Sequence, residues 1–592
     1  MPESSHSNIK SRYELTRVAL GESEADIAII NAKILNVYTG ELFSGDSLLI
    51  KGDKIAYVGK YAKRGIGIRT TIIDASNKIL IPGFIDGHTH MDYICSSYET
   101  ARFAMKSGTT SIVTETAEIA FKLGYKGILE YLKSNQNQPI KFWFTLPPMG
   151  TISPIAKEHV LSLKEVNRLL KRKDCVGLGE TYWGLVNAGN EQQLGMIDQT
   201  LKAGKKLEGH SAGAIANKLQ AYVAMGISSD HEPITPDDAL ERLRLGLSVM
   251  IREGDVRKDL EAVSKIKDYK INLRRLAMAT DGIGPLQLTT QGFMDALVRR
   301  AIHLGFPPVQ AIQMATLNVA EHFNLDDFIG GIAPGRFADI LIVPEIATIK
   351  PELVISNGRI VSRKGEISFK PRHHIYPGYA FSNLKLDREF NAQDFSVRTD
   401  INATTVKVRG IDQLTNVLTK EFTFGLRINM GQIEMDIERD IIKVAAIEHI
   451  YIPGKTFTGF IHGLGLKMGA VATSTCWDST ILTVAGASEI DMAIAVNRIR
   501  EIGGGTVVSL NGEIISELAF PIGGLISDEP MECLADKLIA IQKSAEQMGC
   551  LSPDIRTTLS VLATPAIPYF RICESGYYSI RSNQMMDLVV EE

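Results

Sequence analysis

Six residues of metal-ligand type each follow an apolar stretch of this chain. Two of them lie in Gly87-His88-Thr89-His90, directly after Ile81-Pro82-Gly83-Phe84-Ile85-Asp86. Histidines at positions i and i+2 of an extended segment point to the same side, so both imidazoles can reach one cation. A single such residue is most often a satisfied polar group at a strand end, whereas six in the same setting favour a metal centre. The six are His88, His90, Glu180, His210, His231 and Asp281.

This set of side chains suits two borderline divalent cations, such as manganese, iron or zinc. Imidazoles supply neutral nitrogen, and a carboxylate can bridge two ions and offset their charge. Zinc shows the size of the effect, because water bound to it has a pKa of about 7 in place of about 15.7, which provides hydroxide near neutral pH. Asp281 is able both to bind one ion and to pass a proton from that water to a leaving group. The chemistry that we predict is metal-assisted hydrolysis.

The elements that carry these residues are predicted to form a (β/α)8 barrel over residues 81–325. Apolar strand-like runs alternate with longer helical patterns about eight times over roughly 240 residues, as such a barrel requires. Its active site lies at the carboxyl ends of the strands, where the six residues are found. An open, doubly wound sheet is the structural alternative, because periodicity alone does not exclude it.

We predict two further domains outside the barrel, because a chain of 592 residues is too long to fold around one hydrophobic core. Short β-branched runs broken by turn signals flank the barrel on both sides, and we expect them to form one β-sandwich domain from residues 1–80 and 326–385. Residues 386–592 combine β patterns with helical segments, which indicates an α+β domain. The predicted fold is therefore a barrel inserted into a small β-sandwich and followed by an α+β C-terminal domain.

Composition points to a small-molecule substrate. The formal net charge is -4, which provides no field for gathering nucleic acid. No apolar segment has the length of a signal peptide or a membrane span, so we expect no membrane association. The six cysteines are sparse and show no CxxC pair, which fits free thiols in a cytoplasmic protein. A homo-oligomer is expected, although the sequence does not fix its size.

The pattern resembles the amidohydrolase superfamily, whose barrels open with the PGFIDxHxH motif seen at Pro82–His90. Within it the chain is similar to the adenine deaminase family over most of its length. That resemblance rests on GLGE at 177–180, GISSDHE at 226–232, ERLRLGLSVMIREG at 241–254, AIQMATLNVAEHF at 311–323, IAPGRFADILIV at 332–343, GLGLKMGAVA at 463–472, MAIAVNRIREIGGGTVV at 492–508 and GLISDEP at 524–530.

The resemblance implies hydrolytic deamination of adenine or a related purine with two divalent metal ions. All six metal positions carry over, with Glu180 as the bridging carboxylate. Glu118 and Glu232 match acidic positions of the family and join Asp281 as expected catalytic residues. One alternative is hydrolysis of another small cyclic substrate, an N-substituted purine or a ring amide, by the same centre. The other is a non-catalytic metal-binding scaffold.

Several positions depart from the family pattern where substrate is expected to bind. Asp92 stands in a segment that differs from the usual His-Ile-Glu-Ser-Ser, and Ala117 replaces a histidine. Tyr182 and Trp183 are bulkier than expected after Glu180, and Trp477 replaces the first histidine of His-Asp-Ser-His. We predict Asp92, Tyr182, Trp183 and Trp477 as substrate-binding residues. Because a pocket rejects analogues that leave its polar groups unpaired, these changes also predict that adenine is a poor substrate.

Overall fold

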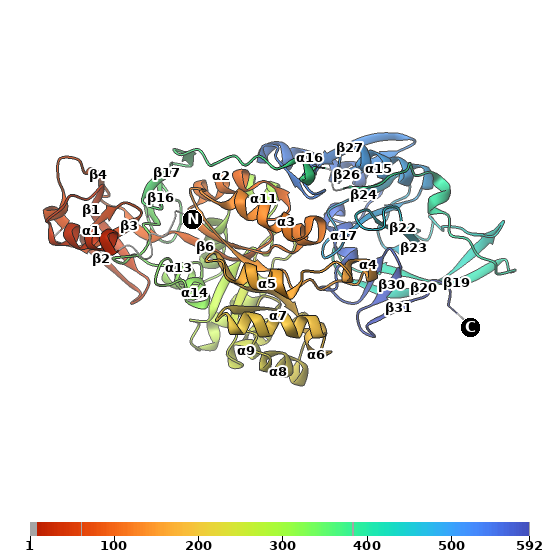
Figure 1. Cartoon of the computed structure of the whole chain (residues 1–592), viewed down its shortest axis with the longest axis horizontal. Coiled ribbons are helices and arrows are strands. Elements are labelled where there is room, and N and C mark those ends of the chain that lie inside the picture. Colours follow the sequence, from red (N-terminus) through yellow and green to blue (C-terminus); the bar gives the residue numbers. More distant parts are fainter. Residues whose placement is uncertain (1–8, 61, 382–383, 591–592) are drawn as a thin grey trace.

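A computed structural model describes residues 9–60, 62–381 and 384–590 of the chain. Three parts follow one another along its longest axis: an N-terminal β domain, a central barrel and a C-terminal domain (Figure 1). The segment after β17 (Arg359–Arg363), drawn in green, runs past the barrel to the C-terminal domain (Figure 1). It is attached on the way, because the Gln138 side-chain amide donates a hydrogen bond to the Arg372 carbonyl at 2.8 Å.

The β domain is assembled from both flanks of the barrel, as predicted. β5 is the joint, because it pairs with β1 on one side and with β15 on the other. At the far end of the sheet β3 returns to the segment before β15, where the Ile55 amide donates to the Arg336 carbonyl at 3.0 Å. The sheet thus folds over an apolar core. Its strands in the described chain are β1 (Ile27–Asn36), β2 (Glu41–Lys51), β3 (Lys54–Gly59), β4 (Thr71–Asp74), β5 (Ile79–Pro82), β15 (Ile340–Val343), β16 (Leu353–Ser356), β17 and β18 (Glu366–Ile367).

Eight parallel strands of the described residues close into a barrel. They form two hydrogen-bonded sets, one of β6 and β8 to β11 and one of β12 to β14, which meet at both edges. The Asp281 amide donates to the His88 carbonyl at 3.0 Å, and the Ser228 amide donates to the Leu207 carbonyl at 2.8 Å. This closure excludes the doubly wound alternative. The strands are β6 (Phe84–Thr89), β8 (Thr109–Thr114), β9 (Lys141–Leu146), β10 (Cys175–Tyr182), β11 (Lys206–His210), β12 (Ser229–Asp230), β13 (Ser248–Arg252) and β14 (Leu276–Ala279).

Local signals fix where the barrel helices begin and end. The Thr235 hydroxyl accepts from the Asp238 amide at 3.1 Å, and Pro236 occupies the first turn of the helix that they start. Gly108 ends a helix at φ 79°, and a Cβ atom there would lie 2.6 Å from Leu341. Helices connecting the strands include α2 (Ser97–Ser107), α3 (Ala117–Asn135), α5 (Leu163–Leu170), α7 (Glu191–Lys202), α8 (Ala216–Ala224), α9 (Pro236–Arg244), α12 (Met294–His303) and α13 (Pro308–Met314).

The C-terminal domain is an α+β unit, as predicted. One helix, α15, packs its apolar side chains on the sheet. The strands of the sheet are, in order within the described residues, β21 (Gln432–Ile433), β20 (Thr419–Asn429), β19 (Thr405–Gln413), β23 (Thr456–His462), β22 (Ile441–Glu448), β25 (Ile481–Gly486), β24 (Ala470–Thr473), β26 (Gly505–Leu510) and β27 (Glu513–Ala519). The longer helices are α15 (Glu489–Glu501) and α16 (Met531–Gln547), and β29 (Phe570–Cys573), β30 (Gly576–Ser579) and β31 (Gln584–Met586) form a small separate sheet.

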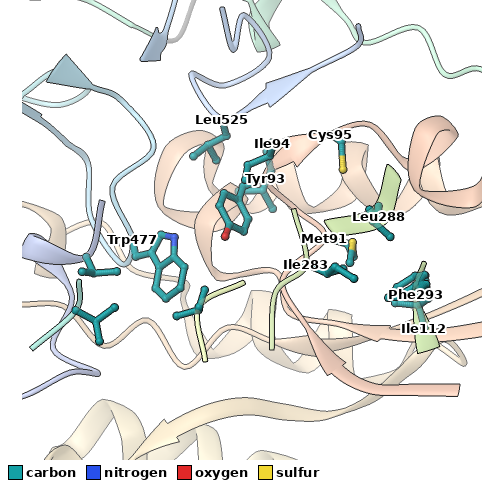
Figure 2. Packing of buried hydrophobic residues seen from close by; sticks show 14 of the residues in the cluster. Met91, Tyr93, Ile94, Cys95, Ile112, Ile283, Leu288, Phe293, Trp477 and Leu525 are labelled. Carbon is teal, nitrogen blue, oxygen red and sulfur yellow. The ribbon is translucent and has the colours of Figure 1, made fainter. Parts of the chain in front are cut away.

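The C-terminal domain docks on the loop that follows the first barrel strand. β7 (Ile94–Cys95) of that loop pairs in parallel with β28 (Ile526–Ser527), and the Ile94 amide donates to the Leu525 carbonyl at 2.8 Å. Figure 2 shows Leu525 next to Ile94 and the ring of Trp477 beside Tyr93. The Trp477 and Tyr93 rings meet edge to face, with centroids 6.0 Å apart. The domain therefore covers the mouth of the barrel.

A buried lysine forms a second contact between these domains. The Lys122 ammonium on α3 donates to the Ile481 carbonyl at 2.9 Å and lies 3.1 Å from His449 Nε2. Burial lowers the pKa of Lys122 to about 8.

Among the described residues, no helix is long and apolar enough to cross a membrane.

Candidate metal centre

The six residues singled out by the sequence converge at the carboxyl ends of the barrel strands. His88, Glu180 and His210 lie within the last residues of their strands, and the other three follow β6, β12 and β14 within two residues. All are almost completely buried, with between 3 and 7% of each residue exposed. We refer to His88, His90, Glu180, His210, His231 and Asp281 as the six-residue cluster.

Two carboxylates form the centre of the cluster. Glu180 Oε1 lies 3.1 Å from His210 Nδ1 and 2.9 Å from His231 Nε2. Asp281 Oδ1 lies 3.1 Å from His88 Nε2 and 3.7 Å from His90 Nε2. Glu180 Oε1 is also 3.5 Å from His88 Nε2, which places it between the two groups of histidines. Potential ligand atoms of His88, His90, Glu180 and Asp281 lie within 4.8 Å of one another. The same holds for those of Glu180, His210 and His231.

Three of the histidines direct their second ring nitrogen at an acceptor outside the cluster. His88 Nδ1 is 3.5 Å from Glu115, and His90 Nδ1 is 3.4 Å from Glu118. His210 Nε2 is 3.0 Å from the backbone carbonyl of Ala566 in the C-terminal domain. A histidine that binds a metal with one nitrogen almost always donates a hydrogen bond with the other, and this arrangement provides both.

The electrostatics of the cluster show an excess of negative charge. Burial alone lowers the pKa of His88, but the neighbouring carboxylates of Asp281, Glu115 and Glu180 outweigh it and raise that pKa well above its ordinary value. Burial likewise opposes ionisation of Glu180, yet the neighbouring histidines hold its pKa well below the ordinary range. A site that stabilises positive charge this strongly is suited to cations.

Unpartnered polar atoms give a second indication that the cluster fits metal ions. Both carboxylate oxygens of Glu115 are buried and lack a hydrogen bond of normal geometry, although His88 Nδ1 lies 3.5 Å from Oε1. His231 Nε2 also lacks a hydrogen bond of normal geometry, although Glu180 lies within reach. Buried polar groups are rarely left without partners. Imidazole nitrogens and carboxylates, with some groups still unsatisfied, form a donor set that fits borderline divalent cations.

Arg252 at the end of β13 connects two carboxylates beside the cluster. Its guanidinium contacts Glu232 and lies 3.2 Å from Asp281 Oδ2. Burial raises the pKa of Glu232, but Arg252 and His210 outweigh it, so that this pKa lies below its ordinary value. For Asp281 the hydrogen bond to His88 is the main contribution that overcomes burial, and its pKa is also lowered. Both carboxylates are therefore ionised at neutral pH.

A cavity of about 320 Å³ opens beside the cluster. Polar residues of the barrel, including Glu180, Glu232, Arg252 and Asp281, form one side of it. The C-terminal domain forms much of the other side through Val417, Leu418, Trp477, Ala566, Ile567, Pro568 and Tyr569. The C-terminal domain therefore contributes directly to the wall of the pocket.

The predicted substrate-binding residues differ in their relation to this cavity. Trp477 lines it and stacks on His90 with centroids 5.5 Å apart. Tyr182 instead donates its hydroxyl to Asp478 at 2.8 Å, and the Trp183 indole donates to the Ala212 carbonyl at 2.8 Å. Asp92 accepts from the Ile119 amide at 3.0 Å, at the start of α3. Of these four described side chains, Trp477 is the one that reaches the cavity wall.

The expected catalytic carboxylates also lie in different places. Glu232 lines the cavity, whereas Glu118 lies behind His90. Ala117, which replaces a histidine of the family pattern, begins α3 next to Glu118 and does not line the cavity.

Two residues of the site were not predicted, although the sequence carries a usable signal for both. Glu115 follows the apolar run Ser111-Ile112-Val113, and Arg252 ends the run Val249-Met250-Ile251. Both therefore occupy the strand-end setting that identified the six-residue cluster. Asp478 lies in the segment that matches His-Asp-Ser-His, although it was not predicted as a site residue. Ala566, which reaches the site from a loop of the C-terminal domain, carries no comparable pattern.

Comparisons with known proteins show which proteins this chain is similar to. The amidohydrolase family matches residues 79–361, and the adenine deaminase C-terminal domain matches residues 416–584. The adenine deaminase of Moorella thermoacetica is 34% identical over 584 residues, covering 97% of this chain and 98% of that protein. That of Cenarchaeum symbiosum is 32% identical over 583 residues, covering 98% and 95%. Among solved structures, the β-aspartyl dipeptidase of Fervidobacterium islandicum AW-1 has a TM-score of 0.47 at 16% identity, covering 58% of this chain and 98% of that chain.

Proposed function

This chain belongs to the adenine deaminase family of amidohydrolases, and we propose that it hydrolyses the exocyclic carbon–nitrogen bond of adenine with two divalent metal ions held by the six-residue cluster. The observation that carries the proposal is the convergence of these six buried side chains beside a cavity. In the reaction water adds its oxygen to the purine carbon that bears the amino group. The products are a 6-oxopurine and ammonia.

Bound divalent ions would supply the activation of water that this hydrolysis needs. Glu180 lies between the two groups of histidines and is the residue that would hold both ions. Manganese, iron and zinc all suit nitrogen and carboxylate ligands. Arg252 offsets part of the negative charge of Glu232 and Asp281 and keeps both carboxylates in fixed positions.

The reaction moves two protons, and both come from water. One ends on the leaving nitrogen and the other on the ring nitrogen next to the attacked carbon. Asp281 and Glu232 are ionised and line the cavity, so each is able to accept a proton and deliver it to substrate. We assign the leaving nitrogen to Asp281 and the ring nitrogen to Glu232. Glu118 lies behind His90, and its contribution would be to orient that histidine.

The apolar half of the cavity supports a second candidate, an N-substituted purine. Leu418, Ile567 and Tyr569 are available to pack against a substituent that adenine lacks. The expectation that adenine is a poor substrate loses most of its support, because Asp92, Ala117, Tyr182 and Trp183 do not line the cavity and Trp477 does. The loss of polar partners is therefore smaller than the sequence alone indicated.

Turnover of a substrate panel by protein loaded with each metal tests the function. The panel contains adenine, N6-methyladenine and a cyclic amide. We expect two metal equivalents and kcat/KM for adenine above about 10⁴ M⁻¹s⁻¹. Faster turnover of N6-methyladenine would favour the second candidate. Metal binding without turnover of any panel member would contradict hydrolysis and leave the scaffold alternative.

Substitution of Glu232 tests the assignment of its proton transfer. Glu232→Gln keeps the shape of the side chain but removes the proton acceptor, and we expect kcat to fall by about 10²–10⁴-fold with metal retained. Glu241→Gln on α9 is the matched control and should turn over at the wild-type rate. A kcat of Glu232→Gln within threefold of wild type would rule the role out.

The remaining expectations concern the setting of the enzyme. A reducing cytoplasm is supported by its cysteines, none of which forms a disulfide in the described chain and five of which are buried. The homo-oligomer stays a prediction.

A further inference from the structure

A chain of hydrogen bonds connects the C-terminal domain to a histidine of the six-residue cluster. Tyr182, two residues after Glu180, donates its hydroxyl to Asp478 Oδ2 at 2.8 Å. The same oxygen accepts a hydrogen bond from the Thr564 hydroxyl. That hydroxyl also accepts from the Ala566 amide at 3.0 Å. The Ala566 carbonyl then accepts from His210 Nε2 at 3.0 Å, which returns the chain to the barrel.

The last contact decides which nitrogen of His210 is free to bind a metal. A backbone carbonyl only accepts hydrogen bonds, so Nε2 must carry the proton. In the neutral ring, Nδ1 then has the free electron pair. His210 Nδ1 lies 3.1 Å from Glu180 Oε1 and so faces the cluster. The carbonyl therefore selects the tautomer and the ring orientation that metal binding needs.

The Thr564 hydroxyl is the point at which this carbonyl is held in place. Thr564 is completely buried, and its hydroxyl fixes the turn from residue 564 to residue 566 by accepting from the Ala566 amide. Asp478 is also buried, so the hydroxyl supplies one of its two side-chain donors. Removing the hydroxyl would leave the Ala566 amide without its partner and free the turn to reorient.

We propose that the C-terminal domain positions His210 for metal binding, with Thr564 and Asp478 as positioning residues that act through the Ala566 carbonyl. This inference rests on the proposed function, because it takes the six-residue cluster to be the metal site. It goes beyond that function by giving the C-terminal domain a part in metal affinity as well as in the wall of the pocket. Outer partners of metal-binding histidines typically contribute 10–100-fold in affinity.

Zinc affinity of full-length variants, measured by competition with a chelator, tests the proposal. We expect Thr564→Val to bind one zinc equivalent about 10–100-fold more weakly than wild type. Thr564→Ser keeps the hydroxyl and should restore the affinity to within threefold. The matched control is Thr506→Val, since Thr506 is also completely buried and its hydroxyl lies 2.9 Å from that of Thr473, away from the cluster. It should keep wild-type zinc affinity even if its Tm falls.

Wild-type zinc affinity in Thr564→Val would overturn the proposal, as would equally weak binding by Thr564→Ser. If Thr564→Val does not fold, Tyr182→Phe tests the same chain from the barrel side. That variant should weaken zinc binding at least threefold, and unchanged affinity would overturn the proposal. Wild-type protein that binds zinc but does not turn over adenine would refute the proposed reaction. The zinc affinities of the variants would still test whether the C-terminal domain positions His210.

Discussion

Glu180 is the residue on which the histidines of the cluster converge. Its Oε1 atom lies within 3.8 Å of a nitrogen from each of His88, His90, His210 and His231. Its ionised form is strongly favoured by these neighbours. A single carboxylate in this position can bind two cations at once and offset part of their charge.

Replacing this carboxylate by an amide should separate metal binding from folding. In Glu180→Gln we expect the loss of at least one metal equivalent and a fall in turnover of at least about 100-fold, because a neutral amide is a poor bridge. The control is Glu208→Gln, which changes another buried glutamate, one that pairs with His322 at 2.8 Å. That variant should keep its metal content, as measured by elemental analysis. If Glu180→Gln still bound two ions and turned over substrate normally, Glu180 would not be a metal ligand.

The residues of the site differ in how well sequence predicts them. His88 and Asp281 end apolar runs, and a barrel brings the ends of its strands together whatever their separation in sequence. Trp477 was predicted from a departure in a family motif and does line the cavity. The Ala566 carbonyl had no signal, because it is a backbone group that contacts His210 from 356 residues away. Its position depends on how two domains dock, which no local pattern encodes.

At the scale of elements, α3 connects the barrel to the C-terminal domain. Its N-terminal end carries Glu118 behind the cluster, and Lys122 one turn later reaches β25 and His449. Repetition of strands and helices predicted the barrel. The strand order of the C-terminal sheet was not predicted, because it depends on pairings such as β19 with β23 between distant segments.

The buried lysine predicts a pH dependence of stability. Its pKa in the folded protein is about 8, against an ordinary value of 10.5. Between these values the unfolded chain binds more protons than the folded one, so the free energy of unfolding from this group rises with pH, by up to about 3 kcal/mol at pH 10.5. This added stability decreases as pH falls from 10.5 and is lost as pH falls through 8.

We expect this rise to be absent from Lys122→Met. The measurement is the Tm difference between wild type and variant at pH 7.5, 9 and 10, which should move in favour of wild type as pH increases. Lys126→Met, on the exposed side of the same helix, is the control and should follow the wild-type pH dependence. A constant difference between wild type and Lys122→Met would show that the lysine is not perturbed.

At the scale of the whole molecule, the six-residue cluster joins barrel strands β6, β10, β11, β12 and β14. β6 and β14 lie at one seam of the two strand sets, and β11 and β12 lie at the other. Ions bound here would connect both seams and the Ala566 turn of the C-terminal domain. Metal binding should therefore stabilise the barrel against unfolding.

Removal of metal is expected to lower the Tm reversibly. A ligand present at about 1,000 times its Kd contributes roughly 4 kcal/mol, which corresponds to a shift of about 5–10 °C for a domain of this size. Scanning calorimetry before and after dialysis against a chelator, with zinc added back, measures it. Glu180→Gln should show a smaller shift under the same treatment. Equal melting temperatures with and without metal would contradict this prediction.

The pairing of β5 with β15 has a consequence during synthesis on the ribosome. Ile81 pairs with Leu341, so the apolar strand Ile79–Pro82 meets its second neighbour only after some 260 further residues have been made. At 5–20 residues per second, the edge of β5 stays unpaired for roughly 13–50 s. An unpaired apolar edge is a template for wrong pairing. We therefore expect nascent chains of this protein to need chaperone protection until the barrel has been translated.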